Sequence, residues 1–262
     1  MPLEQLLLSN LAAIALICVV LWLVSLIRRD ASIVDIFWGI GFVVVAWLTF
    51  TTSAVSELKA VFLALMVTTW GLRLAGYLAW RNIGKDEDYR YAAMRQRHGS
   101  RFPIVSLITV FGLQGLLMWV ISLPIQVGIP DAESWNAIAT VGLVLWSIGW
   151  LFETIGDYQL ARFKAQASNK GRVMSEGLWR YTRHPNYFGD FLVWWGFYLV
   201  AAKPDSFWWT IIGPLIMSFL LIRVSGVRLL ENSLRDRVAG YKEYVRNTSP
   251  FFPLPPKNLP AD

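Results

Sequence analysis

The sequence is poor in the residues that build disulfides and metal centres. It contains one cysteine, Cys18, and only two histidines among 262 residues. A single cysteine cannot form a disulfide within the chain, and it excludes a metal site made of several cysteines. Charged residues are also scarce, at 16% against the about 25% that is usual for a soluble domain. We therefore expect a membrane protein with no bound metal.

The sequence contains long apolar segments with few charged residues. A helix needs about 20 mostly apolar residues to cross the hydrocarbon core of a bilayer. Seven segments come close to this length, which predicts an all-α, polytopic integral membrane bundle of about seven transmembrane helices, with six or eight as alternatives. The predicted spans are residues 6–27, 33–52, 60–80, 104–129, 135–163, 187–202 and 206–223. A cytoplasmic amphipathic tail follows over 224–262, and we treat residues 1–262 as one domain.

The distribution of Lys and Arg predicts how the chain crosses the membrane. Basic residues gather in four segments that would all lie on one side of a seven-span bundle: 28–29, 81–101, 162–183 and the tail from Arg223. The opposite loops hold only Lys59 and Lys203. Since basic loops stay in the cytoplasm, the N-terminus should lie outside and the C-terminus in the cytoplasm, most simply at a bacterial inner membrane. This asymmetry accounts for the net charge of +6 without a nucleic acid partner.

Ionisable residues inside the predicted spans are the first functional candidates, because a charge in hydrocarbon is expensive and usually serves a function. They gather in the cytoplasmic half of the bundle, as Asp35, Arg73, Glu153, Asp157, Asp190 and Arg223. This one-sided cluster predicts a polar pocket open to the cytosol, with basic loops at its mouth. The alternative is a set of ion pairs that only hold helices together.

Arginine and lysine beside aromatic residues at this mouth suit a phosphate-bearing ligand, because a guanidinium binds phosphate oxygens with two parallel hydrogen bonds. The sequence has no GxGxxG and no GxxxxGKS/T segment, so neither a Rossmann nor a P-loop cradle is predicted. A nucleotide would have to be held by side chains between helices.

The most informative segment is EGLWRYTRHPNYFGD, from Glu176 to Asp190. Pro185 favours the first turn of a helix, where its missing N–H is not needed. Asn186 would then present hydrogen-bonding groups toward the mouth, and Asp190 could accept from a ribose or amide one turn deeper. His184 is more typical of a structural donor than of a catalyst.

This segment resembles the C-terminal signature of the steroid 5α-reductase family, in its bacterial branch with a DUF1295-type domain. Sterol C14 and C7 reductases and isoprenylcysteine-type methyltransferases carry a similar signature. Further similarity lies in GDYQLARFK at Gly156–Lys164, in FGLQG at Phe111–Gly115 and in the stretch from Arg223 to Glu231. Together these segments cover most of the chain from the second predicted span onward.

The resemblance implies a seven-span bundle that holds NADPH in a cavity facing the cytosol, while a steroid or sterol-like lipid enters from the bilayer. In that family, hydride adds to C5 of a 3-oxo-Δ4-steroid and a proton then reaches C4. A polar group hydrogen-bonds the C3 carbonyl and stabilises the enolate that develops. By matching position, the resemblance implies cofactor contacts for Asp157, Lys164, Arg172, Tyr181, Asn186, Asp190 and Arg223. Glu231 matches such a position but differs in residue type. We add Arg73 and Arg81 as cofactor contacts because they lie at the basic mouth.

The family activates the carbonyl with a Glu and a Tyr, and Asp35 is the natural acidic candidate here. A protonated Asp35 could donate to a carbonyl, as a neutral buried acid can, unless a cation such as Arg73 pairs with it. The sequence singles out no tyrosine partner. Trp38, Trp70 and Tyr77 lie close enough to Asp35 in the predicted arrangement of spans to be considered as its partner. We take Trp38 and Tyr77 as the catalytic candidates beside Asp35.

Two other functions stay open. A membrane methyltransferase that uses S-adenosylmethionine on a prenyl or phospholipid acceptor needs the same cavity and shares the RHPNY element. The 2′-phosphate and longer anionic bridge of NADPH suit the many basic residues better. A non-enzymatic lipid-binding or scaffold protein would explain the spans and the basic tail, but not the ionisable residues within the spans.

Overall fold

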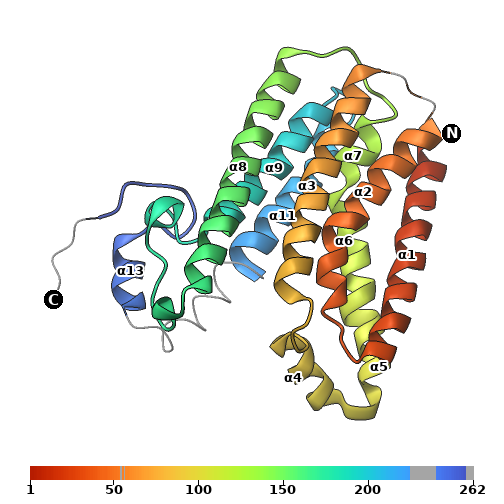
Figure 1. Cartoon of the computed structure of the whole chain (residues 1–262). Helices are drawn as coiled ribbons and strands as arrows, with labels where there is room; N and C mark the ends of the chain where they lie inside the picture. Colours follow the sequence, from red (N-terminus) through yellow and green to blue (C-terminus); the bar gives the residue numbers. More distant parts are fainter. Residues whose placement is uncertain (54, 56, 225–239, 258–262) are drawn as a thin grey trace. The chain divides into compact units, whose positions relative to one another are not determined.

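The computed structural model describes residues 1–53, 55, 57–224 and 240–257 (Figure 1). In this part of the chain the backbone forms helices joined by turns, and the β-type contact found there is an isolated bridge between Thr182 and Ser249. The expected all-helical fold is confirmed for the described residues. Gly240 has a φ of 76° and directly precedes a helix. Residues 225–239 of the predicted tail helix lie outside the described part.

The helices carry the labels of Figure 1. In chain order they are α1 (Leu3–Arg28), α2 (Ile33–Ser53), α3 (Leu58–Asn82), α4 (Tyr89–His98), α5 (Phe102–Ser106), α6 (Leu113–Ile121), α7 (Leu123–Gly128), α8 (Ala137–Ala165), α9 (Pro185–Ala201), α10 (Phe207–Thr210), α11 (Ile212–Phe219) and α13 (Tyr241–Asn247). Tighter 3-10 turns form η1 (Gly99–Arg101), η3 (Ala167–Asn169) and η4 (Gly177–Arg180), and wider π turns form η2 (Leu107–Gly112) and η5 (Leu220–Val224).

Six helical stretches of the described chain are long and apolar enough to cross a membrane. They are Leu3–Arg28, Ile33–Ser53, Leu58–Asn82, Tyr89–Ile121, Ala137–Ala165 and Phe207–Val224. Most agree with the predicted spans to within a few residues, but the fourth starts earlier than predicted and ends at Ile121 instead of 129. Ser122 leaves the helical conformation with a ψ of 1°, and Pro124 opens α7, because proline lacks the N–H that a helix interior needs.

The predicted sixth span, 187–202, folds as helix α9. This helix has 17 residues, at the lower limit of the roughly 17–25 that a transmembrane helix needs, and it is not among the six stretches. The predicted seventh span is divided into α10, α11 and η5, which together form the last of the six.

The chain divides into two compact units, which are described separately. Unit 1 comprises Met1–Ala137 with Val200–Gly213, and unit 2 comprises Ile138–Leu199 with Pro214–Asp262. Large side chains with almost no exposed surface form the two cores: Phe42, Leu63, Trp70, Phe111 and Met118 in unit 1, and Trp194, Phe197 and Tyr198 in unit 2. The expectation of one domain stays a prediction.

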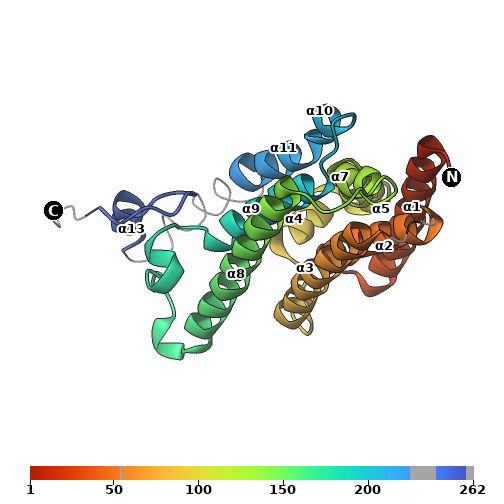
Figure 2. The same cartoon turned by 90° about the horizontal axis from the view of Figure 1, so that it is seen from above.

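A glycine pair lets two helices of unit 1 touch backbone to backbone. A Cβ atom on Gly39 of α2 would lie 2.3 Å from the carbonyl oxygen of Gly71 on α3, and one on Gly71 would lie 2.5 Å from the oxygen of Gly39. No side chain fits at such a distance. Helices α2 and α3 therefore lie side by side because both positions lack a Cβ (Figure 2).

Helices α8 and α9 of unit 2 run antiparallel and meet in the same way. A Cβ on Gly149 of α8 would lie 2.5 Å from the oxygen of Gly189 on α9, and one on Gly196 would lie 2.8 Å from the oxygen of Gly142. In both helices the two glycines are seven residues apart, which is about two helical turns, so they share one face. This contact fixes the register of the two helices that carry the polar residues of unit 2.

Candidate functional site

The first turns of α2 and α4 bring Asp35 and Tyr91 together in unit 1. The Tyr91 hydroxyl donates a hydrogen bond of 2.7 Å to Oδ1 of Asp35. Gln114 of α6 donates from Nε2 to the Tyr91 oxygen at 3.1 Å. Tyr91 is buried, whereas the Asp35 side chain keeps 22% of its surface exposed. The result is a carboxyl–phenol pair that a third helix holds in place and that a ligand could reach.

Two arginines interact with the Asp35 carboxylate of this pair. Nη2 of Arg90 lies 3.1 Å from Oδ2 of Asp35, and Arg81 interacts electrostatically with Asp35 from the end of α3. The cation paired with Asp35 is thus Arg90, whereas Arg73, which the sequence suggested, is half-buried two turns before Arg81. Asp88 fixes Arg90 by accepting from its backbone N–H and its Nε. Burial works to raise the pKa of Asp88, but these hydrogen bonds outweigh it and hold that pKa below its ordinary value.

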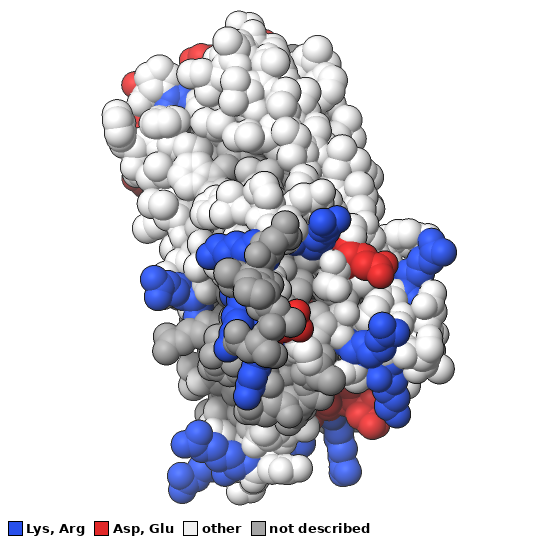
Figure 3. All heavy atoms as spheres, turned by 90° about the vertical axis from the view of Figure 1, so that its left-hand side faces the viewer, with Lys and Arg blue, Asp and Glu red and all other residues white. Residues whose placement is uncertain are grey.

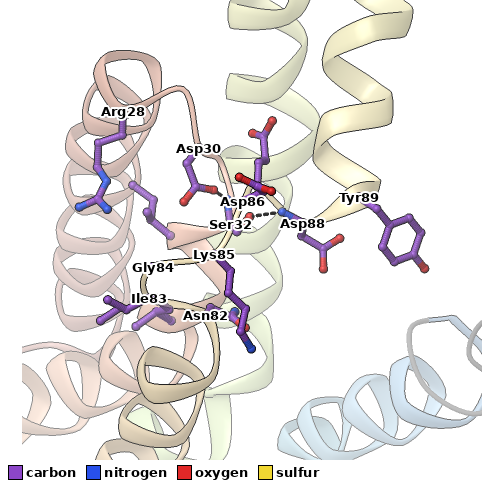
Figure 4. Close-up of a pocket in the computed structure, with 13 residues that line it drawn as sticks. Arg28, Asp30, Ser32, Asn82, Ile83, Gly84, Lys85, Asp86, Asp88 and Tyr89 are labelled. Carbon is purple, nitrogen blue, oxygen red and sulfur yellow. Dashed lines mark hydrogen bonds between the residues drawn. The ribbon is translucent and has the colours of Figure 1, made fainter. Parts of the chain in front are cut away.

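The loop before α4 is anchored to the loop between α1 and α2. Glu87 accepts a hydrogen bond of 2.8 Å from the backbone N–H of Ala31 and two more from the Arg95 guanidinium, at 2.7 and 3.0 Å. The backbone N–H of Asp88 donates to Oγ of Ser32 at 2.7 Å, a contact visible in Figure 4. These contacts hold the start of α4 next to the start of α2. They explain why Tyr91 reaches Asp35 from a different helix.

A hollow of about 420 Å³ lies beside these loops (Figure 4). Its lining combines two cations, several carboxylates and three isoleucines, from Arg28, Asp30, Ser32, Ile33, Ile36, Asn82, Ile83, Gly84, Lys85, Asp86, Glu87, Asp88 and Tyr89. Neither Asp35 nor Tyr91 belongs to this lining. The hollow and the carboxyl–phenol pair are therefore distinct features of unit 1.

The other two predicted catalytic residues lie among aromatic side chains. Trp38 packs edge to face on Phe42, with ring centroids 5.6 Å apart. The Arg81 guanidinium lies 5.8 Å from the centroid of the Tyr77 ring. The tyrosine that hydrogen-bonds Asp35 is Tyr91, which the sequence reasoning missed because it lies in the polar stretch between two apolar runs. The catalytic roles of Trp38 and Tyr77 stay predictions.

Unit 2 brings together four of its predicted polar residues along the α8–α9 contact. Nδ2 of Asn186 donates to Oδ1 of Asp157 at 3.1 Å. Asp157 and Glu153 are 5% and 3% exposed, so two carboxyl groups are buried on successive turns of α8. Gly156 lies against the start of α9, where a Cβ would be 3.3 Å from the Asn186 nitrogen. Asp190 follows Asn186 by one turn on α9. Paired in this way, Asp157 and Asn186 can jointly bind hydroxyl or amide groups.

The RHPNY loop is closed by the chain's C-terminal segment. Nη1 of Arg183 donates to the carbonyl oxygens of Val245 and Thr248, at 2.7 and 3.0 Å, and so caps the end of α13. Oγ1 of Thr182 donates to the Phe251 carbonyl at 2.8 Å. Arg183 is buried at 8% exposure, which makes it a structural residue of this loop. The tail therefore supports the turn that leads into Asn186.

The remaining predicted cofactor residues are mostly on the surface. Lys164, Arg172, Tyr181, Arg81 and Arg223 are exposed, and Glu231 lies outside the described residues. On the face drawn in Figure 3, Lys and Arg side chains lie at the surface, with Asp and Glu side chains among them. Exposed cations can bind phosphate oxygens, and a carboxylate–amide pair can bind hydroxyl or amide groups.

Six membrane-length helices in the described part, with a carboxyl–phenol pair at the end of one of them, define an integral membrane protein of the multi-span helical class. The family model "Protein of unknown function (DUF1295)" matches residues 21–248, which is most of the chain, and the chain belongs to this family. This confirms the DUF1295 part of the resemblance, while membership of the steroid 5α-reductase family stays a prediction.

Two similar curated proteins are from Schizosaccharomyces pombe. The chain is 25% identical to "Uncharacterized protein C594.04c" over 274 residues, which cover 89% of this chain and 76% of the relative. It is 32% identical to "Uncharacterized protein C9.08c" over 93 residues, which cover 29% of this chain and 33% of that relative. No solved structure matches the chain.

Proposed function

We propose that this protein is an NADPH-dependent reductase of the C4=C5 double bond of a 3-oxo-Δ4-steroid or a related enone lipid. The observation that carries the proposal is the hydrogen-bonded row Gln114–Tyr91–Asp35, with donor–acceptor distances of 3.1 and 2.7 Å. A phenol held between an amide and a carboxyl group is suited to hydrogen-bond a carbonyl oxygen. Reduction of an enone requires that kind of group.

In this proposal the residues of unit 1 act on the substrate carbonyl. Tyr91 turns its hydroxyl from Asp35 to the carbonyl oxygen and stabilises the negative charge that develops there. Gln114 keeps the phenol oxygen in place by donating to it. Asp35, paired with Arg90, holds the Tyr91 hydroxyl in position until the substrate arrives. Since Gln114 holds the phenol oxygen, only the Tyr91 hydroxyl hydrogen has to turn when the substrate arrives.

The residues of unit 2 bind the cofactor in this proposal. NADPH, when bound, supplies the hydride that adds to C5, and a proton added to C4 completes the reduction. Asp157 and Asn186 accept and donate hydrogen bonds to its hydroxyl or amide groups, with Asp190 one turn further on α9. Lys164 and Arg172 are exposed cations that would bind the phosphates.

The proposal also includes a topology. Helix α9 is the additional span that raises the number from six to seven, because its 17 residues rise about 26 Å, close to the thickness of the hydrocarbon core. With seven spans the basic segments lie in the cytoplasm and the N-terminus lies outside. The lipid substrate then arrives through the membrane.

The test uses the purified full-length chain in detergent. We expect it to bind NADPH in preference to S-adenosylmethionine, and to oxidise NADPH when progesterone or testosterone is added, with a 5α-reduced steroid as the product. Loss of turnover in Tyr91→Phe, with NADPH binding kept, would link the reaction to the pair. Preferential binding of S-adenosylmethionine would favour a membrane methyltransferase instead. Failure to bind or consume NADPH with any enone steroid would reject the proposal.

A further inference from the structure

The hollow of unit 1 lies where three membrane-length helices reach the same end of that unit (Figure 4). Its lining takes Arg28 from the end of α1, Ile33 and Ile36 from the first turn of α2 and Asn82 from the end of α3. Because a membrane-length helix ends where hydrocarbon gives way to water, the hollow lies at that boundary. Its volume of about 420 Å³ falls within the roughly 300–1,000 Å³ of small-molecule sites.

Large apolar side chains are exposed around the hollow. Ile83, which lines it, is 69% exposed, and Ile27, next to Arg28 of the lining, is 84% exposed. Trp80, two residues before the end of α3, is 68% exposed, and tryptophan is enriched at the membrane–water boundary. Lipid can cover such side chains, whereas a ligand from the cytosol would leave them in water. They therefore favour a ligand that is itself part of the membrane.

Two of the four carboxylates in the lining are already paired with arginines. Both oxygens of Glu87 accept hydrogen bonds from the Arg95 guanidinium, at 2.7 and 3.0 Å. Asp88 accepts from Nε of Arg90 at 2.8 Å. Because their charge is compensated within the chain, these two carboxylates contribute little to the attraction of a ligand.

Four other charged side chains of the lining can still bind a ligand. Those of Arg28, Lys85 and Asp86 make no hydrogen bond or ion pair with the described residues, and Asp30 uses one oxygen to accept from the backbone N–H of Ser32. Together the four carry two positive and two negative charges. A ligand with an anionic and a cationic group matches this set better than an ion of either sign.

We propose that the hollow binds the headgroup of an aminophospholipid of the phosphatidylethanolamine type. Its phosphate oxygens accept hydrogen bonds from Arg28 and Lys85, and its primary ammonium group donates to Asp30 and Asp86. The acyl chains then lie along the exposed apolar side chains. Phosphatidylcholine carries the same charges but has no N–H to donate, and phosphatidylglycerol has no cation, so both should bind more weakly.

The bound lipid has a structural role in this proposal. The lining includes Ser32 and Asp88, whose hydrogen bond of 2.7 Å joins the α1–α2 loop to the start of α4. A headgroup held by Arg28 and Lys85 adds a second link between α1 and the loop that leads into α4. The lining does not include Tyr91, so the lipid is not the substrate, and the inference does not depend on the proposed reaction.

The test measures lipid binding to the full-length protein in detergent by native mass spectrometry. Dioleoyl-phosphatidylethanolamine, dioleoyl-phosphatidylcholine and dioleoyl-phosphatidylglycerol are titrated separately, so that only the headgroup differs. We expect phosphatidylethanolamine to bind roughly three- to tenfold more tightly than the other two, because it alone makes hydrogen bonds of both charge types. Equal affinity for the three lipids, or binding of none, would overturn the proposal.

Two variants separate the ammonium contact from the phosphate contact. Asp86→Asn keeps the shape and removes the negative charge, so the preference for phosphatidylethanolamine over phosphatidylcholine should fall. Lys85→Gln should weaken both lipids alike. The double variant Lys85→Gln/Asp86→Asn is compared with Lys242→Gln/Glu243→Gln, which removes a neighbouring cation and carboxylate at exposed positions of α13 and should bind as the wild type does. Equal binding by the two double variants would refute the assigned site.

A last arm distinguishes a membrane lipid from a soluble molecule with the same headgroup. Phosphoethanolamine, which has no acyl chains, is added to the protein together with dioleoyl-phosphatidylethanolamine at the same concentration. We expect it to displace little of the lipid, since it cannot cover the exposed isoleucines. Full displacement would make the hollow a site for a soluble zwitterion and would overturn the lipid assignment.

Discussion

The hydroxyl of Tyr91 lies 2.7 Å from a carboxylate oxygen of Asp35, a residue 56 positions earlier in the chain. Neither residue is a usual occupant of a membrane protein's apolar interior. The loop contacts of Glu87 and Ser32 bring them together before any ligand is bound. Several consequences can be measured.

Removing the phenol oxygen should separate catalysis from binding. Tyr91→Phe keeps the buried ring but loses the hydrogen bonds to Asp35 and from Gln114. If Tyr91 contacts the carbonyl, enone reduction should fall roughly 10²- to 10³-fold, as when one oxyanion donor is lost, while NADPH affinity stays unchanged. Tyr89→Phe, on the same helix but 66% exposed, should behave as the wild type. An active Tyr91→Phe enzyme would exclude this role.

Asn186 should matter for the cofactor and not for the fold. Asn186→Ala removes the amide that donates to Asp157 at the start of α9. We expect NADPH to bind roughly tenfold more weakly, because the amide that would contact the cofactor and that orients Asp157 is lost. Expression should be kept with a modest fall in melting temperature, since buried Asp157 loses one hydrogen bond, and Asn169→Ala in the neighbouring loop should leave NADPH binding intact. Loss of expression with no specific change in affinity would assign Asn186 a structural role instead.

The glycine contact between α8 and α9 should tolerate no side chain. In Gly189→Ala the new Cβ would meet the Gly149 oxygen and the Glu153 nitrogen, both at 2.5 Å, and both belong to the backbone. We expect a loss of stability of about 1–3 kcal/mol or more, seen as a lower melting temperature in detergent. Gly76→Ala is the matched control, because a Cβ there meets nothing within 4 Å. It should leave the melting temperature unchanged or raise it, since alanine favours helix by about 1 kcal/mol.

Arg183 should hold the C-terminal segment onto the RHPNY loop. In Arg183→Lys a single ammonium replaces the guanidinium that spans two carbonyl oxygens of the α13 end. Limited proteolysis should then release a C-terminal fragment faster than in the wild type. Arg180→Lys changes an exposed residue of the same segment and should have no such effect. Equal cleavage of the two variants would show that the tail is held by other contacts.

The sequence predicted the helices better than the partners of their polar residues. Apolar length alone located α2 and α3 to within two residues at each end, because desolvating the backbone requires a helix wherever an apolar run enters the bilayer. It misplaced the end of the fourth span, since Ser122 and Pro124 are compatible with an apolar run but break the helix. Local hydrophobicity does not register such a break.

Some contacts between site residues could be predicted from the sequence, and others could not. Asp157 and Asn186 were predicted from one motif each, and their contact follows from the helix pair that carries them. Tyr91 could not be predicted as the partner of Asp35, because it lies in a polar stretch and reaches Asp35 only through loop contacts between distant segments. One signal was available: Asp88, a helix-capping residue type, marks the start of α4 just before Tyr91.

The contact between Asp35 and Tyr91 can form only after the chain has been synthesised beyond residue 91. Asp35 lies in the first turn of α2, so it can stay at the aqueous boundary until α4 has been made. A chain truncated before residue 91 would carry Asp35 at the start of α2 without the phenol that donates to it.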